Sequence, residues 1–563
     1  MSDTLNLSLF DEAEYEERAD YIEKNDLIKW TATSKHFDNI QKKLIQVGAK
    51  LIVGPRGAGK THQMRCAYFK CRKDYSRPLP LYVSFNHYLR LETYLHDNSN
   101  AIDIFHAWVL AKIIVSCSKE YNIYINDISF DLDFLEKFIS DVEKQRYNES
   151  YSIILSELNI SLVQKLIEDA IEKNDRKRAV VFLDDAALTF TNDYMIEFFD
   201  IFRSLKTIKI SPKASVYPGT TQYGPRFHVG QDAERVDIWM NVEDQDYLQF
   251  MDAIVSTRFG NSLDIDKDIR ELLMYAAFGI PRTYIMYLRS YIDSDRKSPQ
   301  SKFNSILSEK CTNILNEYRS IAKKMPQYNR IIETGDEMIS EIIKTIKSFN
   351  HKKIDEFPND YKKNIVIGIE DIDIKAERMI KFLIEAGIIY SQEDISHGTE
   401  RKIKRFIPHL ALLIKERIFT KSKGFNASVL LNILKGPSEK HPVRKKFNRL
   451  LNENKINNIS LDLPPCDNCK APRIAEGQRY CHICGMQLIE SSTFKNCMST
   501  KLIELPFTDF QKRVIGKTRY QTIEDVLTSD NSAVELRKVK GVGDKYAAKI
   551  IIKINEWTNE FLY

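Results

Sequence analysis

Two groups of residues in this sequence have the types and the spacing for chemistry. The first is a run with the pattern Gly-x-x-x-x-Gly-Lys-Thr, namely Gly54-Pro55-Arg56-Gly57-Ala58-Gly59-Lys60-Thr61. Its glycines let backbone N–H groups turn inward around phosphates; we expect Lys60 to reach the β- and γ-phosphates and the Thr61 hydroxyl to bind Mg²⁺. The run therefore predicts a nucleotide-phosphate site, with a chance glycine loop as the alternative.

The second group is four cysteines in two close pairs, Cys466 with Cys469 and Cys481 with Cys484. Each Cys-x-x-Cys pair can place two sulfur atoms on one ion, and two pairs at this separation are typical of a four-thiolate Zn²⁺ ribbon. Because four thiolates leave no open coordination position, we expect a structural metal. Redox thiols or an iron site are the alternatives, and His482 is expected to be a bystander.

Short elements must position the glycine-rich run. Residues 49–53 predict a buried strand before it, and residues 62–73 predict a helix after it. A second apolar strand, residues 178–183, ends in Asp184 and Asp185. We expect Asp184 to hold Mg²⁺ through water and Asp185 to polarise an attacking water as general base. The alternative is a solvated strand end.

Two further positions could complete such a site. A third strand-like segment, residues 214–221, ends in Thr220 and Thr221, either of which could lie between the two acids and the γ-phosphate. A Gly-Ile-Pro-Arg element predicts a helix start that places Arg282 in the first turn, where it could point at a nucleotide. An ordinary strand-end threonine and a capping turn with a solvated arginine are the alternatives.

Taken together, these motifs resemble the AAA+ class of P-loop ATPases, and within it the origin-recognition and replication-initiator branch that merges into the STAND signalling ATPases. The resemblance covers about residues 30–420 and implies a helical lid whose sensor arginine corresponds to Arg282. It also implies an arginine supplied by a neighbouring subunit, for which Arg226 and Arg235 are candidates. A plain surface arginine is the alternative at both positions.

The same resemblance implies a winged helix after the lid. Residues 376–387 predict an amphipathic helix stopped by Gly387, and residues 388–390 with 405–407 predict the paired strands of a wing. In some relatives this domain contacts DNA, and in others it acts as a hinge or an autoinhibitory latch. The sequence leaves both roles open.

The end of the chain predicts a helix, a Gly-Val-Gly hairpin and a second helix over residues 534–551, with a supporting helix at 520–527. This segment resembles a helix-hairpin-helix domain, as found at the end of the RNA polymerase alpha subunit and in repair nucleases. The resemblance implies a grip on a DNA phosphate without base reading, by Gly541, Gly543, Lys545 and Lys549. A structural or protein-binding copy of the fold is the alternative.

Composition and charge limit the classes of protein to which the chain could belong. The net charge of +5 over 563 residues is too small to argue for nucleic-acid binding by itself. The amino terminus lacks a basic, apolar leader, and we expect no apolar run near the ~20 residues that a membrane span needs. The nine cysteines are expected to be reduced or metal-bound. These features predict a cytoplasmic chain without membrane contact.

We therefore expect a multidomain α/β chain built around a P-loop parallel sheet. The expected segments are an acidic N-terminal extension (1–30), an AAA+-like ATPase core (31–245), a helical lid (246–330), a winged-helix-like domain (331–420), a basic linker with helices (421–463), a zinc ribbon (464–492) and an α-helical helix-hairpin-helix domain (500–563). The basic linker is either a solvated surface or a phosphate-contacting segment.

The expected function is an ATP-binding and ATP-hydrolysing switch or assembly factor that binds DNA, independently of its sequence, through the ribbon and the hairpin domain. ATP, Mg²⁺ and Zn²⁺ are the expected cofactors, and a homo-oligomer or a partner effector protein is the expected assembly. One alternative is a STAND-type signalling or defence sensor whose C-terminal modules hold a protein. The other is an ATP-locked scaffold that hydrolyses slowly or not at all.

Overall fold

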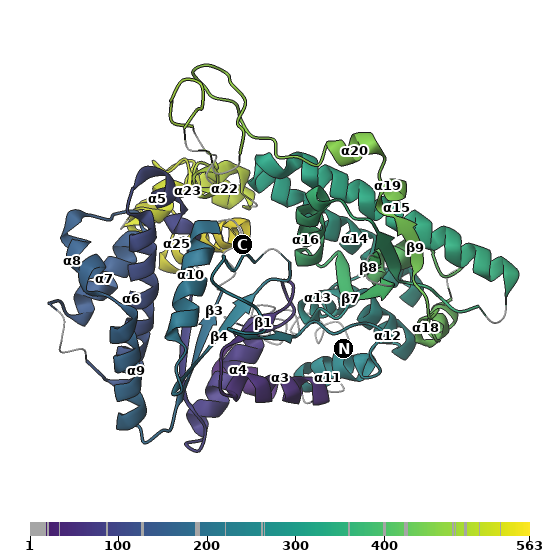
Figure 1. Cartoon of the computed structure of the whole chain (residues 1–563), viewed down its shortest axis with the longest axis horizontal. Coiled ribbons are helices and arrows are strands. Elements are labelled where there is room, and N and C mark those ends of the chain that lie inside the picture. The colour runs from purple at the N-terminus through teal and green to yellow at the C-terminus, as the bar shows by residue number, and fades with distance from the viewer. Residues whose placement is uncertain are drawn as a thin grey trace.

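The computed structural model describes residues 19, 22–32, 34–85, 88–124, 129–185, 192–219, 221–259, 263, 265–358, 361–397, 401–421, 426–475, 478, 480–488, 493–505, 507–529 and 531–562. Figure 1 shows two large units side by side, each built around its own sheet, with a small module projecting at the top. We divide the chain into four parts: the core unit (residues 34–238), the lid unit (239–459), the projecting ribbon (466–488) and the C-terminal bundle (493–562).

A parallel sheet in the order β2-β3-β4-β1-β5 forms the centre of the core unit. Its strands are β1 (Lys50–Val53), β2 (Leu79–Ser84), β3 (Ala179–Asp184), β4 (Ile210–Val216) and β5 (Glu234–Asp237). The β1, β3 and β4 strands are buried along their whole length, and the sequence of β3 is accordingly an almost continuous apolar run. Val53 pairs with Val216 and Leu183 with Ala214, so the carboxyl ends of these strands meet at one edge.

Helices cover both faces of this sheet (Figure 1). They include α3 (Lys35–Ile45), α4 (Lys60–Lys73), α5 (Glu92–Asp97), α6 (Ala101–Tyr121), α7 (Leu132–Glu143), α9 (Ile160–Lys173) and α10 (Asn192–Leu205). Ahead of them, α2 (Lys24–Lys29) packs Leu27 against Cys66 of α4. The acidic extension expected at residues 1–30 therefore ends in a helix that packs against the core unit, while residues 1–18 lie outside the described residues.

Helix α6 corrects one expectation. Among the described residues it is the one helix long and apolar enough to cross a membrane by length and composition, although we expected no such run. However, 67% of its most apolar window is buried, and the helix packs against α7, α9, α10 and β2. Its apolar character therefore serves the core of the unit.

The lid unit has a four-stranded sheet in the order β7-β8-β6-β9 and a single hydrophobic core. Its strands are β6 (Ile367–Glu370), β7 (Ile389–His397), β8 (Arg401–Pro408) and β9 (Val443–Lys446). Its helices include α11 (Tyr247–Phe259), α12 (Lys267–Ala276), α13 (Pro281–Ile292), α14 (Pro299–Lys324), α15 (Asn329–Glu356), α16 (Glu377–Glu385), α17 (Leu410–Lys415) and α18 (Ala427–Lys435). The wing strands expected from the sequence do pair, with Tyr390 opposite Ile407.

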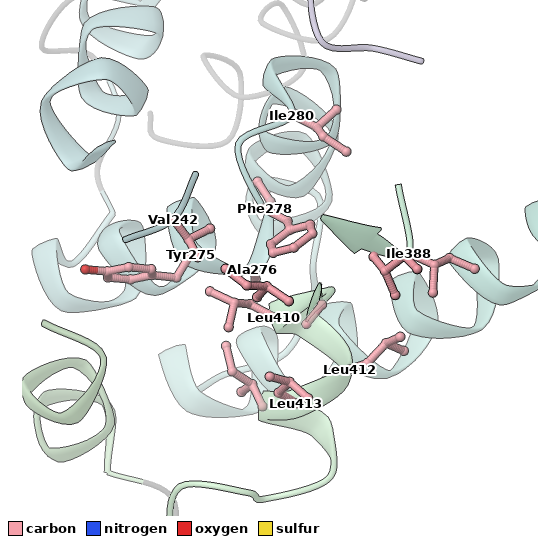
Figure 2. Packing of buried hydrophobic residues seen from close by; sticks show 14 of the residues in the cluster. Val242, Tyr275, Ala276, Phe278, Ile280, Ile388, Leu410, Leu412 and Leu413 are labelled. Atoms are coloured by element: carbon pink, nitrogen blue, oxygen red, sulfur yellow. The ribbon is translucent and has the colours of Figure 1, made fainter. Parts of the chain in front are cut away.

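The expected lid and winged-helix segments share that one core. Figure 2 shows Phe278 and Ile280, which precede α13, packed in the same cluster as Ile388 and Leu410 from the wing region. Helix α15 begins at Asn329, two residues before the winged-helix-like segment expected from residue 331. The two segments therefore share one packed core.

Residues 421–463, expected as a basic linker, are also part of the lid unit. They supply β9, which pairs in parallel with β6, and the buried Leu430 and Leu434 of α18. Several of their lysines form ion pairs with acids of the lid helices: Lys421 with Asp355, Lys435 with Glu271, and Lys455 with Glu337. The segment looked unbalanced in sequence because its acidic partners lie far away along the chain.

The C-terminal bundle packs against the core unit. It contains α21 (Thr493–Met498), α22 (Asp509–Ile515), α23 (Ile523–Leu527), α24 (Ser532–Arg537) and α25 (Asp544–Leu562). Its buried residues continue the hydrophobic core around α6 and α10, and α21 contacts α5. The Phe494 N–H donates to Glu92 Oε2 at 2.9 Å, and Arg146 donates to the Thr528 carbonyl at 2.7 Å.

Candidate nucleotide and metal sites

The glycine-rich run connects β1 to α4, and α4 begins at Lys60. Gly57 (φ +81°) and Gly59 (φ +94°) have the left-handed backbone that favours glycine. A Cβ on Gly57 would also lie 3.0 Å from the Arg282 Cβ and 3.1 Å from the Ile280 Cγ2. The loop therefore needs glycine for its own turn and, at Gly57, for close packing against the start of α13.

The Lys60 side chain lies back over its own loop. Its Nζ donates to the Gly54 carbonyl at 2.7 Å and to the Pro55 carbonyl at 3.2 Å. It also sits 4.1 Å from the centroid of the Tyr217 ring. Burial lowers the pKa of Lys60 to about 7, against the opposing influence of nearby acids, first of all Asp184 and Asp185.

The two acids lie at the end of β3, the strand next to β4. Asp184 is 1% exposed, and Tyr82 Oη donates to its Oδ2 at 2.6 Å. Asp185 follows the strand with φ +55°, and its N–H donates to Ser215 Oγ at 2.9 Å. Ser84 Oγ donates to Asp185 Oδ2 at 3.3 Å. Side chains of β2 therefore donate to both carboxylates, and Ser215 of β4 accepts from the Asp185 backbone.

The end of β4 differs from the expectation. The strand stops at Val216, so the residue that extends it toward the acids is Tyr217. Thr221 lies beyond the turn, where its Oγ1 donates to the Tyr217 carbonyl at 3.0 Å, and Thr220 lies outside the described residues. The expected strand end at 220–221 is wrong because Pro218 and Gly219 turn the chain away earlier.

The structure brings Arg282 to the phosphate loop. It stands in the first turn of α13, after Pro281, and its N–H donates to the Gly57 carbonyl at 3.3 Å. Its positive charge also acts on Lys60, whose pKa it helps to lower. The two candidate trans arginines lie on the core unit, where Arg226 pairs with Asp200 at 3.5 Å and Arg235 with Asp237 at 2.6 Å.

Sequence reasoning missed several residues of this site. Tyr82 and Ser84 belong to β2, a strand whose short apolar run carries no motif. Glu385 ends α16, and its charge counteracts the desolvation of Lys60 and raises the pKa of Tyr217. Gly387, just after α16, would place a Cβ 3.9 Å from the Pro55 Cβ. The end of α16 therefore adjoins the phosphate loop, which no local pattern could reveal.

A parallel sheet with a phosphate loop between β1 and α4, and a buried acid at the end of β3, defines a P-loop NTPase core. In this sheet β4 lies between the loop strand β1 and the acid strand β3. Lys60, Asp184 and Arg282 lie close together at one edge of this core.

Fourteen solved chains are similar to this one, and three of them are described here. The Walker-type ATPase PABY2304 of Pyrococcus abyssi is 12% identical, with a TM-score of 0.37, over 71% of this chain and 99% of its own. The Aeropyrum pernix ORC1 protein, solved in complex with DNA, is 13% identical, with a TM-score of 0.31, over 70% and 96%. CDC6p from Pyrobaculum aerophilum is 13% identical, with a TM-score of 0.29, over 73% and 97%.

At such low TM-scores these similarities carry no argument about function. No protein-family model matches the chain, and no curated protein matches it.

The four ribbon cysteines lie together as the spacing predicts. Their sulfur atoms are all within 4.8 Å of one another, with 3.6 Å between Cys466 and Cys484 and 3.4 Å between Cys469 and Cys481. Four ligands at about 2.3 Å around a tetrahedral Zn²⁺ would be about 3.8 Å apart. The N–H of Met486 and the side chain of Asn468 lower the pKa of Cys484 to about 6, which favours a thiolate. The donor set fits zinc.

The expected hairpin of the C-terminal bundle joins α24 to α25. Gly541 has φ +93°, and neither Gly541 nor Gly543 would bring a Cβ within 4 Å of another group. Both glycines are exposed, as are Lys545 and Lys549 on the first turns of α25. Asp544 begins that helix and pairs with Arg537 at 2.5 Å. The hairpin is accessible while the bundle packs on the core unit.

Proposed function

We propose that this chain is an ATP-binding and ATP-hydrolysing AAA+-type ATPase that binds DNA, independently of sequence, through its C-terminal modules. ATP binding or hydrolysis would serve as the switch. The observation that carries the proposal is the convergence of Lys60, Asp184 and Arg282, from three distant segments, on one phosphate loop.

Each side chain has a proposed role. The loop N–H groups and Lys60 bind the β- and γ-phosphates, because backbone donors at a helix N-terminus favour anions. Thr61 and Asp184 are the residues that would hold Mg²⁺, which supplies charge neutralisation on the phosphates. Asp185 accepts the proton of the attacking water. Arg282 contacts the γ-phosphate from the lid, and Thr220 stays a candidate for the same task.

DNA binding is assigned to the hairpin and, secondarily, to the ribbon. Gly541 and Gly543 expose backbone N–H groups before a helix, and Lys545 with Lys549 add positive charge beside them. The bundle that carries them rests on α5 of the core unit. This packing gives a physical route by which DNA at the hairpin could influence the ATPase core.

The ATPase proposal is tested by turnover with and without DNA. Wild type, Lys60→Ala and Asp185→Asn are compared for phosphate release and for ATP binding at equilibrium. We expect Lys60→Ala to lose binding and Asp185→Asn to bind ATP but to turn over at least about tenfold more slowly. Equal background rates in all three would refute hydrolysis, and normal ATP binding by Lys60→Ala would refute the nucleotide site.

The DNA proposal is tested by the salt dependence of binding. A double variant, Lys545→Ala with Lys549→Ala, should lower the slope of log K against log salt by about 1.8, because each lost phosphate contact removes about 0.9. Lys553→Ala is the matched control, since Lys553 lies on the same helix but reaches Gln511 of α22. A slope unchanged in the double variant would refute the hairpin contact.

One observation favours a second function for the ribbon. Four large apolar side chains are exposed on this small module: Ile474 (73%), Tyr480 (61%), Ile483 (68%) and Met486 (49%). Such a concentration is typical of a protein-binding surface, as the signalling-sensor alternative requires. Under that alternative, deleting residues 466–488 would leave the affinity for DNA unchanged at every salt concentration.

A further inference from the structure

Tyr217 stands at the centre of the nucleotide site, although no motif contains it. It directly follows β4, the strand between the loop strand β1 and the acid strand β3. Its ring lies 4.1 Å from Lys60 Nζ, the ammonium that also donates to the Gly54 and Pro55 carbonyls. In this conformation the charge of Lys60 is therefore directed to its own loop and to an aromatic face.

The ring is held in this place by two contacts of its own turn. Thr221 Oγ1 donates to the Tyr217 carbonyl at 3.0 Å and closes the turn after the strand. Gly219, with φ +94°, packs against α16, since a Cβ there would lie 3.2 Å from the Lys381 Cα and carbonyl oxygen. The turn that carries the ring is thus closed by its own hydrogen bond and packed against α16 of the lid unit.

Two kinds of partner would compete for the Lys60 ammonium. A cation on an aromatic face is attracted by the negative charge of the π-system, and more strongly where water is excluded. The β- and γ-phosphates attract the same ammonium when a nucleotide binds the loop. The single ammonium of Lys60 cannot make both interactions at full strength, because contact with the ring face draws it away from the phosphates.

We propose that Tyr217 is a positioning residue that holds Lys60 over its ring in competition with the nucleotide phosphates, and so sets the affinity for ATP and ADP. The inference rests on the proposed ATP-binding function. The proposal predicts that removing the ring tightens nucleotide binding, an effect that a merely structural role would not produce. It also has a ligand dependence, because AMP lacks the phosphates that Lys60 would reach.

The test measures equilibrium binding of ATP, ADP and AMP to the full-length chain. We expect Tyr217→Leu to bind ATP and ADP about 2- to 30-fold more tightly than wild type, with AMP unchanged. Tyr217→Phe, which keeps the ring, should restore the wild-type affinity. Affinity for ATP that is unchanged or weaker in Tyr217→Leu would overturn the proposal.

A second series covers the case in which Tyr217→Leu does not fold. Phenylalanine analogues with one, two and three ring fluorines at position 217 keep the shape of the ring and progressively weaken its attraction for a cation. The ATP affinity should then rise step by step with fluorination. A flat series would overturn the proposal even if the leucine variant gave no folded protein.

Two controls separate this proposal from the function on which it rests. Tyr75→Leu removes a comparable pair at the surface, where Arg176 lies 4.3 Å from the Tyr75 ring, and should leave nucleotide binding unchanged. If Lys60→Ala lost ATP binding while the ATP affinity stayed the same across the Tyr217 variants, only the proposed role of Tyr217 would be refuted. If Lys60→Ala bound ATP normally, the nucleotide site itself would fall.

Discussion

The cysteine ribbon and the candidate nucleotide site reach their geometry by opposite routes. In the ribbon, two knuckles of the same backbone form hold the four sulfurs. The Lys470 N–H donates to the Cys466 carbonyl at 2.8 Å, and the Gly485 N–H donates to the Cys481 carbonyl at 2.9 Å. Lys470 (φ +58°) and Gly485 (φ +69°) take the same left-handed conformation after the second cysteine of each pair.

The nucleotide site has only its loop from one stretch of sequence. The ring beside Lys60 comes from the end of β4, the acids from β3, and Arg282 and Glu385 from two helices of the lid unit. A local site depends on spacing, whereas an assembled site depends on every contact that brings its parts together. The two sites should therefore respond differently to the same kind of change.

The largest expected effect is on the ribbon. Cys469→Ser should abolish stoichiometric zinc and unfold residues 466–488, because zinc binding supplies on the order of 10 kcal/mol to such small sites. The nucleotide site should keep its ATP affinity. Metal analysis, limited proteolysis and ATP titration check the three points. Cys117→Ala, at a buried cysteine of α6, is the control and should retain zinc. Lost ATP binding in Cys469→Ser would break the comparison.

The next effect separates local from assembled requirements within the phosphate loop. Gly59→Ala should weaken ATP binding about 5- to 30-fold, because a left-handed backbone costs roughly 1–2 kcal/mol with a side chain. Gly57→Ala has the same backbone cost and also displaces Arg282 and Ile280, so it should weaken binding further. Equal losses in the two variants would mean that the contact with α13 contributes nothing.

The two sites should also respond to pH with opposite signs. Burial lowers the pKa of Lys60 to about 7, so the amine loses its proton above pH 7 and ATP affinity should fall by up to tenfold per pH unit. Lys60→Arg, which stays charged, should lose this dependence. Zinc affinity should instead fall as the pH decreases, because thiolates must lose protons to bind metal. Titrations between pH 6 and 9 measure both.

The smallest effect concerns Thr221. Thr221→Val removes the hydroxyl that donates to the Tyr217 carbonyl, and should lower the free energy of unfolding by about 0.5–1.5 kcal/mol. Turnover should change little, because the side chain supports the turn and lies away from the strand end. Denaturant unfolding and ATP turnover measure the two quantities. A hundredfold loss of turnover with normal stability would instead indicate that Thr221 takes part in catalysis.

The sequence predicted much of the fold because buried parallel strands and capped helices leave local patterns. The strand before the loop, the helix from Lys60 and the acid-ending strand β3 were all expected within a few residues. The wing strands were also expected in their observed pairing. By contrast, β2 was missed because a short apolar run without a motif does not distinguish a strand from a buried helix turn.

The boundaries of the units were harder to predict than their elements. The lid and wing segments expected on either side of residue 330 share one hydrophobic core, and sequence composition does not change at a shared core. The basic segment after residue 420 was read as a linker because its acidic partners, such as Glu271 and Glu337, are distant in sequence. Long-range pairing leaves no local signal.

The sequence by itself determined the chemistry that needs only neighbouring residues. The phosphate loop follows from its glycines and Lys60, and the metal cluster from two short cysteine pairs. Only the tertiary structure decided that Tyr217 stands beside Lys60, and that the lid unit contacts the loop through Arg282. The physical reason is that strand pairing and helix packing bring together residues whose separation along the chain carries no information about their distance in space.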